Sequence, residues 1–188
     1  MPLAASEEQT LKENYDPSGL DGFWVMDLSE SKTRDPDTGE WVPEVIRQQC
    51  VEIRHEGEWA DFRVRIDHAE DLHLYMHYRV RYGDAEWVPY TVVHIDGDPE
   101  HEKLRPNLFR TVHARVGQPI SYLKEVYVDP RTTFRLTRHV DGKADYALMS
   151  RLSEDRQRLV GKVFPAEGRA GIEKWMQRVD RLHFDWPA

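Results

Sequence analysis

The stretch DLHLYMHYRVRY, residues Asp71–Tyr82, alternates two chemically different kinds of side chain without interruption. Leucine, methionine, valine and tyrosine occupy the even-numbered positions, whereas histidine, tyrosine and arginine follow Asp71 at the odd-numbered ones. A period of two residues is typical of a β-strand with one buried face, because successive side chains point to opposite sides of the strand. A helix would scatter both kinds around its axis. The stretch therefore predicts a strand that separates an apolar space from a polar one.

Runs with the same rhythm precede and follow this stretch, and turn sequences such as Asp141-Gly142 separate them. None of these connections holds a helix of the kind that parallel strands require, so the strands should pair antiparallel in chain order. Closing such a series into a barrel removes its exposed edges. We therefore predict a mainly β fold, an up-and-down antiparallel β-barrel of roughly eight to ten strands over about residues 21–164. The expected strands are Gly22–Ser29, Val45–His55, Trp59–Asp67, Asp71–Tyr82, Glu86–Ile95, Phe109–Val116, Ile120–Asp129, Thr132–Val140, Ala144–Leu152 and Arg156–Phe164.

Two helices are expected outside the barrel. Ser6 and Gln9 have the spacing of a capping box, which predicts a short N-terminal helix that Asp16-Pro17 ends. Near the C-terminus, apolar residues recur at helical spacing, which predicts an amphipathic helix over about residues 168–182. The apolar positions of this second helix are Ile172, Trp175, Met176, Val179 and Leu182.

Length and charge restrict the domain count and the partners. A chain of 188 residues suits one domain over residues 1–188. Its formal net charge of −8 repels phosphate backbones, so we expect no nucleic-acid partner. No stretch has the ~18–20 apolar residues of a spanning helix, so we expect no membrane partner. The opening residues lack the basic start and apolar stretch of a secretory signal, which predicts a cytoplasmic location.

Three short motifs resemble those of the lipocalins, within the wider calycin group of ligand-binding barrels. Gly22-Phe23-Trp24 is similar to the Gly-x-Trp of the first lipocalin strand, and Asp145-Tyr146 to the Thr-Asp-Tyr of a late strand, with alanine in place of threonine. Leu159-Val160-Gly161-Lys162 resembles the Leu-x-Gly-Arg of the last barrel strand. The resemblance implies a barrel closed at one end and open at the other, with Lys162 over the indole of Trp24, that holds a small apolar molecule.

The first hypothesis for function is a lipocalin-like protein that binds a small hydrophobic or aromatic molecule. If the apolar face of Asp71–Tyr82 points inward, the cavity is apolar with phenol groups. Arg138 continues the expected inner face of Phe134 and Leu136, where it would anchor an acidic ligand, or it lies near the strand end and reaches water. His94 and His113 flank a long loop at the mouth. The candidate ligand-binding residues are Phe62, Leu74, Met76, Tyr78, Tyr90, His94, His113, Tyr122, Phe134 and Arg138.

The second hypothesis is a cofactor-independent isomerase, cyclase or lyase in the same barrel. It requires the opposite face of the strand to point inward, with His77 as the base and Tyr75 and Arg79 stabilising developing negative charge. The apolar outer wall would then need covering, for which a homodimer is one possibility.

A metal site is not expected from the two histidines of the opening stretch. His73 and His77 lie four residues apart, and on a strand their side chains are ~13 Å apart, too far to share one ion. We expect no cofactor, although one histidine could hold a haem iron as in some calycin barrels.

Overall fold

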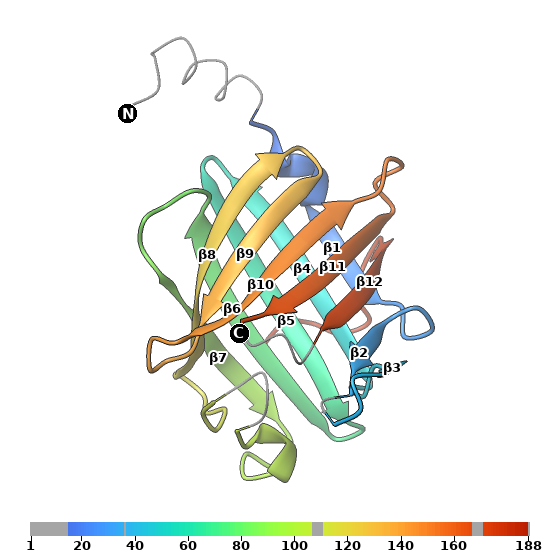
Figure 1. Cartoon of the computed structure of the whole chain (residues 1–188), viewed down its shortest axis with the longest axis vertical. Coiled ribbons are helices and arrows are strands. Elements are labelled where there is room, and N and C mark those ends of the chain that lie inside the picture. Colours follow the sequence, from blue (N-terminus) through green and yellow to red (C-terminus); the bar gives the residue numbers. More distant parts are fainter. Residues whose placement is uncertain (1–14, 36, 107–110, 167–170, 188) are drawn as a thin grey trace.

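The computed structural model describes residues 15–35, 37–106, 111–166 and 171–187. Ten antiparallel strands form a closed ring in which each strand pairs with its neighbours in the ring (Figure 1). The ring contains β1 (Gly22–Met26), β4 (Gln48–Glu56), β5 (Trp59–Ala69), β6 (Leu72–Arg81), β7 (Val88–Asp96), β8 (Pro119–Asp129), β9 (Thr132–Arg138), β10 (Ala144–Leu152), β11 (Arg158–Pro165) and β12 (Ile172–Val179). The predicted mainly β, antiparallel barrel is confirmed, at the upper end of the expected strand number.

The ring closes where the last strand pairs with the first. Phe23 of β1 lies opposite Val179 of β12, and Met26 lies opposite Met176. The short strands β2 (Lys32–Arg34) and β3 (Trp41–Pro43) form a hairpin that pairs with the start of β12. Neither of these two strands was among those expected from the sequence. Each of the ten ring strands has a partner strand on both sides, which leaves little edge on which another chain could add a strand.

Apolar side chains of the barrel wall point inward and polar ones point outward, as the alternation in Asp71–Tyr82 predicts. In β6, Leu72, Leu74 and Met76 are almost completely buried, whereas Arg79 and Arg81 are exposed. The neighbouring β5 buries its apolar residues on the same inner side. Burying one large apolar side chain contributes roughly 1.5–3 kcal/mol, so the alternation fixes which face of each strand points inward.

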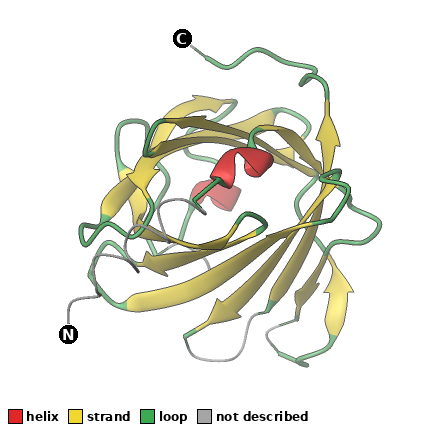
Figure 2. Ribbon diagram, turned by 90° about the horizontal axis from the view of Figure 1, so that it is seen from above, coloured by secondary structure: helices red, strands yellow, loops and turns green. Residues whose placement is uncertain are grey.

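One end of the barrel is closed by the 3-10 turn η1 (Pro17–Leu20), which lies across it (Figure 2). The side chain of Leu20 is buried, and the Leu20 carbonyl accepts a hydrogen bond of 2.9 Å from the indole Nε1 of Trp24. Trp24 itself has no exposed surface. The aromatic ring and the turn together form a floor, as the resemblance implied for this end.

The opposite end carries the loop between β3 and β4 and the second 3-10 turn, η2 (Glu102–Leu104). A strand was expected over Phe109–Val116, but its described residues, from Thr111 onward, form no strand. Ala114 instead donates a backbone hydrogen bond to Leu104, and both side chains are fully buried. Ala114 therefore packs against η2 rather than against a neighbouring strand, while Val116 of the same segment is exposed.

The prediction of a C-terminal helix is wrong. Residues Ile172–Val179 form β12, so the barrel extends to Val179 and does not end near residue 164. Ile172 and Met176 are spaced by four residues, which places them on one side of a helix but equally on one side of a strand. Pairing on both sides with β11 and β1 satisfies the backbone and closes the ring. The expected N-terminal helix lies outside the described residues, and within them no helix is long and apolar enough to cross a bilayer.

Candidate ligand-binding cavity

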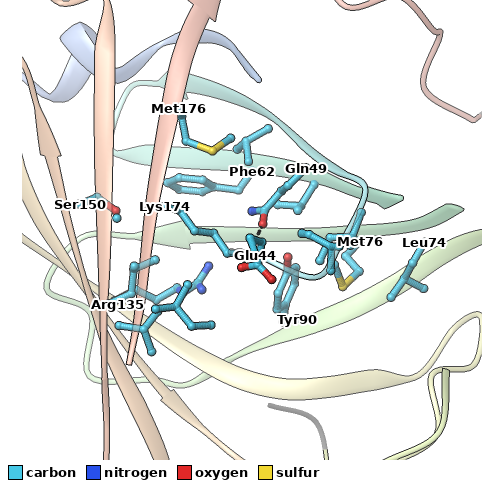
Figure 3. Close-up of a pocket in the computed structure, with 18 of the residues that line it drawn as sticks. Glu44, Gln49, Phe62, Leu74, Met76, Tyr90, Arg135, Ser150, Lys174 and Met176 are labelled. Atoms are coloured by element: carbon cyan, nitrogen blue, oxygen red, sulfur yellow. Dashed lines mark hydrogen bonds and ion pairs between the residues drawn. The ribbon is translucent and has the colours of Figure 1, made fainter. Parts of the chain in front are cut away.

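A cavity of about 600 Å³ occupies the barrel interior (Figure 3). Its lining includes the exposed residues Val45 and Lys103 but not Trp24. This volume lies in the range of sites for small organic ligands. Its wall is mostly apolar. The apolar and aromatic lining residues include Val51, Ile53, Phe62, Val64, Ile66, Leu74, Met76, Tyr78, Tyr90, Ile120, Tyr146, Leu148, Leu159, Val163, Ile172 and Met176.

Arg135 on β9 brings a positive charge into this apolar space. One guanidinium nitrogen donates a hydrogen bond of 2.9 Å to the hydroxyl of Tyr146. The guanidinium carbon lies 5.6 to 5.9 Å from the ring centroids of Tyr78, Tyr90 and Tyr146. Its Nε is buried and has no hydrogen-bond partner among the described residues. A buried guanidinium with an unused donor is costly, so the cavity favours a ligand that supplies an acceptor.

Glu125 on β8 lies opposite Arg135 in the strand register. Its carboxylate accepts a hydrogen bond of 2.9 Å from the hydroxyl of Tyr78. Burial raises the pKa of Glu125 to about 7, while the positive charge of Arg135 and the Tyr78 hydrogen bond limit the rise. Near neutral pH this carboxyl therefore changes charge and only partly balances Arg135.

Lys174 on β12 is a second cation on the cavity wall, and it points toward Gln49 and Glu44 (Figure 3). Its Nζ donates a hydrogen bond of 2.5 Å to the amide oxygen of Gln49 and lies 3.8 Å from Oε2 of Glu44. Burial lowers the pKa of Lys174, and the negative charge of Glu44 opposes that shift. The cavity thus holds two separate polar groups, one around Arg135 and one around Lys174.

Half of the expected ligand-binding residues line the cavity. These are Phe62, Leu74, Met76, Tyr78 and Tyr90. The mouth histidines do not line it: His94 is exposed on β7, and His113 hydrogen-bonds the carbonyl oxygen of Pro99 at 2.9 Å.

The expected orientation of β9 is wrong. Thr133, Arg135 and Thr137 face inward, so Phe134, Leu136 and Arg138 lie on the outer wall. The Arg138 guanidinium lies over two outer-wall rings, 4.6 Å from Trp87 and 5.4 Å from Tyr122, so neither Arg138 nor Tyr122 reaches the ligand space. Sequence reasoning placed the apolar residues of this strand inside, whereas the barrel places its arginine there.

Sequence reasoning therefore missed the polar lining residues, among them Arg135, Tyr146 and Lys174, and it also missed Glu125, which lies opposite Arg135 in the strand register. One signal was partly present in the sequence. Glu125 on β8 and Arg135 on β9 are oppositely charged residues of adjacent strands, but the register shift between Tyr127 and Asp129 that places them opposite each other could not be derived from the turn at Asp129-Pro130. Lys174 carried no such signal, because its segment was assigned to a helix.

The residues proposed for catalysis lie on the outer wall. His77 is 3.0 Å from the Asp61 carboxylate, and Arg79 hydrogen-bonds the exposed Glu56 at 3.2 Å. Tyr75 is buried outside the barrel beneath Phe184 and Trp186 of the C-terminal tail, with ring centroids 6.1 and 6.0 Å away. The orientation that the enzyme hypothesis required, with the histidine face inside, is therefore wrong.

The described histidines do not gather into a metal site. His73 contacts the carboxylate of Asp67 at 2.8 Å, whereas His77 contacts a different carboxylate, that of Asp61, at 3.0 Å. Across the described ranges, no three His, Cys, Asp or Glu side chains come together as metal ligands.

No family model and no curated protein matches the sequence. Among solved structures, the chain is similar to a mutant of the fluorescent protein UnaG, with 8% sequence identity and a TM-score of 0.49 over 87% of this chain and 99% of that chain. The closed antiparallel ring agrees with the antiparallel barrel expected from the sequence. Within it, Gly22-Phe23-Trp24 opens β1, as the resemblance implied for the first strand. The Leu-x-Gly-Lys motif lies in β11, which is the strand before the last.

Proposed function

We propose that this protein binds one small, mainly apolar molecule that carries a carboxylate or another single anionic group, and holds it inside the barrel. The observation that carries the proposal is Arg135, a guanidinium inside an apolar cavity whose Nε finds no hydrogen-bond partner in the described part of the chain. An anionic acceptor placed there would complete the hydrogen bonding of that group.

The lining supports the rest of the ligand description. Aliphatic and aromatic side chains from β4, β5, β6 and β10 surround the space, so most of a bound molecule would contact carbon. The rings of Tyr78 and Tyr90 lie 5.2 Å apart beside the guanidinium, which allows them to pack on an acyl chain or an aromatic ring next to the anionic group. The proposal is therefore an amphipathic acid with its polar end inside.

A fluorescence titration with a dansyl-labelled long-chain fatty acid tests this function. The wild-type protein should bind the probe, and Arg135→Met should weaken binding by roughly 10- to 100-fold, because a charge-assisted hydrogen bond is worth about 1.5–3 kcal/mol. The corresponding labelled alcohol should bind both proteins alike. Arg138→Met removes an arginine from the outer wall of the same strand and should leave the titration unchanged.

Two outcomes contradict the proposal. Equal affinity of wild type and Arg135→Met for the acid would show that the guanidinium holds no anion, and Arg135→Lys serves if the methionine variant does not fold. A Soret band in the absorbance spectrum of the purified protein would instead show that the cavity holds haem rather than the proposed ligand.

The cytoplasmic location and the homodimer stay predictions.

A further inference from the structure

Lys174 differs from an ordinary surface lysine in three ways. Its side chain lines the cavity, its amine is held by Gln49, and a carboxylate lies close to it. It lies opposite Gly161 in the register of β11 and β12, and Gly161 also lines the cavity. The Leu148 side chain packs over Gly161, with its Cδ1 3.2 Å from the place of a Cβ, and Leu148 lines the cavity too. Because Lys174 itself belongs to the lining, a molecule in the cavity can reach its side chain.

We propose that Lys174 forms a reversible imine with an apolar aldehyde that enters the barrel. The proposal rests on the proposed function in one respect, which is that the cavity admits a small apolar molecule. It adds a covalent step and a second ligand class, because the bound group is a carbonyl rather than an anion.

Imine formation needs the neutral amine, since only its lone pair attacks a carbonyl carbon. Burial disfavours the ammonium form and lowers the pKa of Lys174, and the nearby positive charge of Arg135 acts in the same direction. Glu44 is the group that can receive the ammonium proton. Its side chain is 6% exposed, and its buried Oε2, 3.8 Å from Nζ, has no hydrogen-bond partner among the described residues.

The step is balanced within these groups and the aldehyde. The Lys174 ammonium transfers one proton to Glu44, and the amine nitrogen then bonds to the aldehyde carbon while the C=O π electrons move to oxygen. The oxygen takes up one proton and the nitrogen loses one, which gives a carbinolamine. Loss of the hydroxyl with a proton as water then leaves the C=N bond. In total, one amine and one aldehyde give one imine and one water.

The surroundings also stabilise the product. If the imine nitrogen is protonated, the Glu44 carboxylate lies on the side where the ammonium was and balances the positive charge. The apolar groups around the cavity exclude water from the remainder of a bound aldehyde, which opposes hydrolysis. A lysine on the outer wall lacks this dry environment.

Borohydride trapping with cinnamaldehyde as the probe tests the imine. At neutral pH and a small excess of aldehyde, reduction should fix one cinnamyl group per chain, and peptide mass mapping should place it on Lys174. Lys174→Arg should reduce the yield at least tenfold. Lys162→Arg is the matched control, because Lys162 lies on the adjacent strand β11, outside the barrel in an ion pair with Glu173, and this change should leave the yield unaltered.

Labelling spread over several exposed lysines, or on Lys174 no faster than on Lys162, would overturn the proposal. Mapping on the wild-type protein decides this even if Lys174→Arg does not fold. Titration of the wild-type protein with the dansyl fatty acid separates the two proposals: a protein that binds the acid but gives no Lys174 adduct refutes only the imine, whereas a protein that binds neither probe refutes the proposed function as well.

Discussion

The guanidinium carbon of Arg178 lies 4.3 Å from the ring centroid of Trp24, so a side chain of the last strand covers the indole of the first. The same guanidinium donates hydrogen bonds to the carbonyl oxygens of Gly19, Asp21 and Arg156. It therefore joins the floor of the barrel to the strand pair that closes the ring. The sequence motif at 159–162 had assigned this position to Lys162, which instead forms an ion pair with Glu173 outside the barrel.

Replacing Arg178 with methionine should lower the free energy of unfolding by roughly 2–4 kcal/mol, because three carbonyl groups lose a charged donor and Trp24 loses its cation. Arg34→Met is the matched control. Arg34 also covers a tryptophan, at 5.2 Å from Trp41, but it is exposed on the β2–β3 hairpin, and its loss should cost less than about 1 kcal/mol. Urea unfolding of the two variants measures the difference. Equal losses would mean that Arg178 does not secure the closure.

Sequence alternation predicted the strands of this fold wherever one face of the strand is apolar. β4, β5 and β6 follow that rule, and their expected positions agree with the structure to within a few residues. β12 could not be recognised in this way. Its inner face carries Ile172, Lys174 and Met176, so the strand alternation is interrupted by a charge and the four-residue spacing of the two apolar residues matches a helix as well.

The binding site was less predictable than the fold because its polar groups break the rule that finds strands. The rule assigns apolar residues to the inside, which succeeds for Phe62 and Met76 and fails for Phe134. Only the three-dimensional register shows that β9 turns an arginine inward. A site that requires a buried charge must contain a residue that sequence patterning assigns to solvent.

The C-terminal tail stabilises the barrel from outside. Phe184 lies over the guanidinium of Arg65 at 4.1 Å and edge-on to the buried ring of Tyr75. Phe184→Ala should lower the free energy of unfolding by roughly 1–2 kcal/mol, because the ring is half-buried. Phe164→Ala on the outer wall, where the ring is 51% exposed, should cost less than about 1 kcal/mol. Thermal unfolding monitored by circular dichroism compares them, and similar shifts for both would show that the tail does not contribute.

Glu125 should make stability depend on pH. A glutamate in water has an ordinary pKa of 4.5, and burial raises the pKa of Glu125 to about 7 in the folded protein. Between these values the folded state keeps a proton that the unfolded state releases, so the free energy of unfolding falls as pH rises from 4.5 to 7 and is constant above that range. The total loss is on the order of 3 kcal/mol.

Glu125→Gln should remove this loss, so the variant should change little in stability between pH 6 and pH 8 while the wild type becomes less stable. Guanidinium unfolding at several pH values measures both slopes. A slope that persists in the variant below pH 6 belongs to Asp145, whose pKa burial raises to about 6. Wild-type and variant slopes that coincide between pH 6 and pH 8 would show that Glu125 is already ionised at pH 6.

The same ionisation should regulate ligand binding. When Glu125 is protonated, Arg135 keeps an uncompensated positive charge for a bound carboxylate; when Glu125 ionises, it balances that charge and repels the ligand. Affinity for the dansyl fatty acid should therefore be highest near pH 6 and fall about tenfold by pH 8. Burial raises the pKa of both Tyr78 and Tyr90, so these neighbours stay neutral over this range.

In Glu125→Gln the affinity for the acid should be nearly independent of pH, while the labelled alcohol should show no pH dependence in either protein. By linkage, binding of the acid should raise the pKa of Glu125 and take up a fraction of a proton near pH 7, which calorimetry in two buffers of different ionisation enthalpy measures. Proton release on binding, or an affinity for the acid that increases with pH, would mean that the anionic group does not lie beside Arg135 and Glu125.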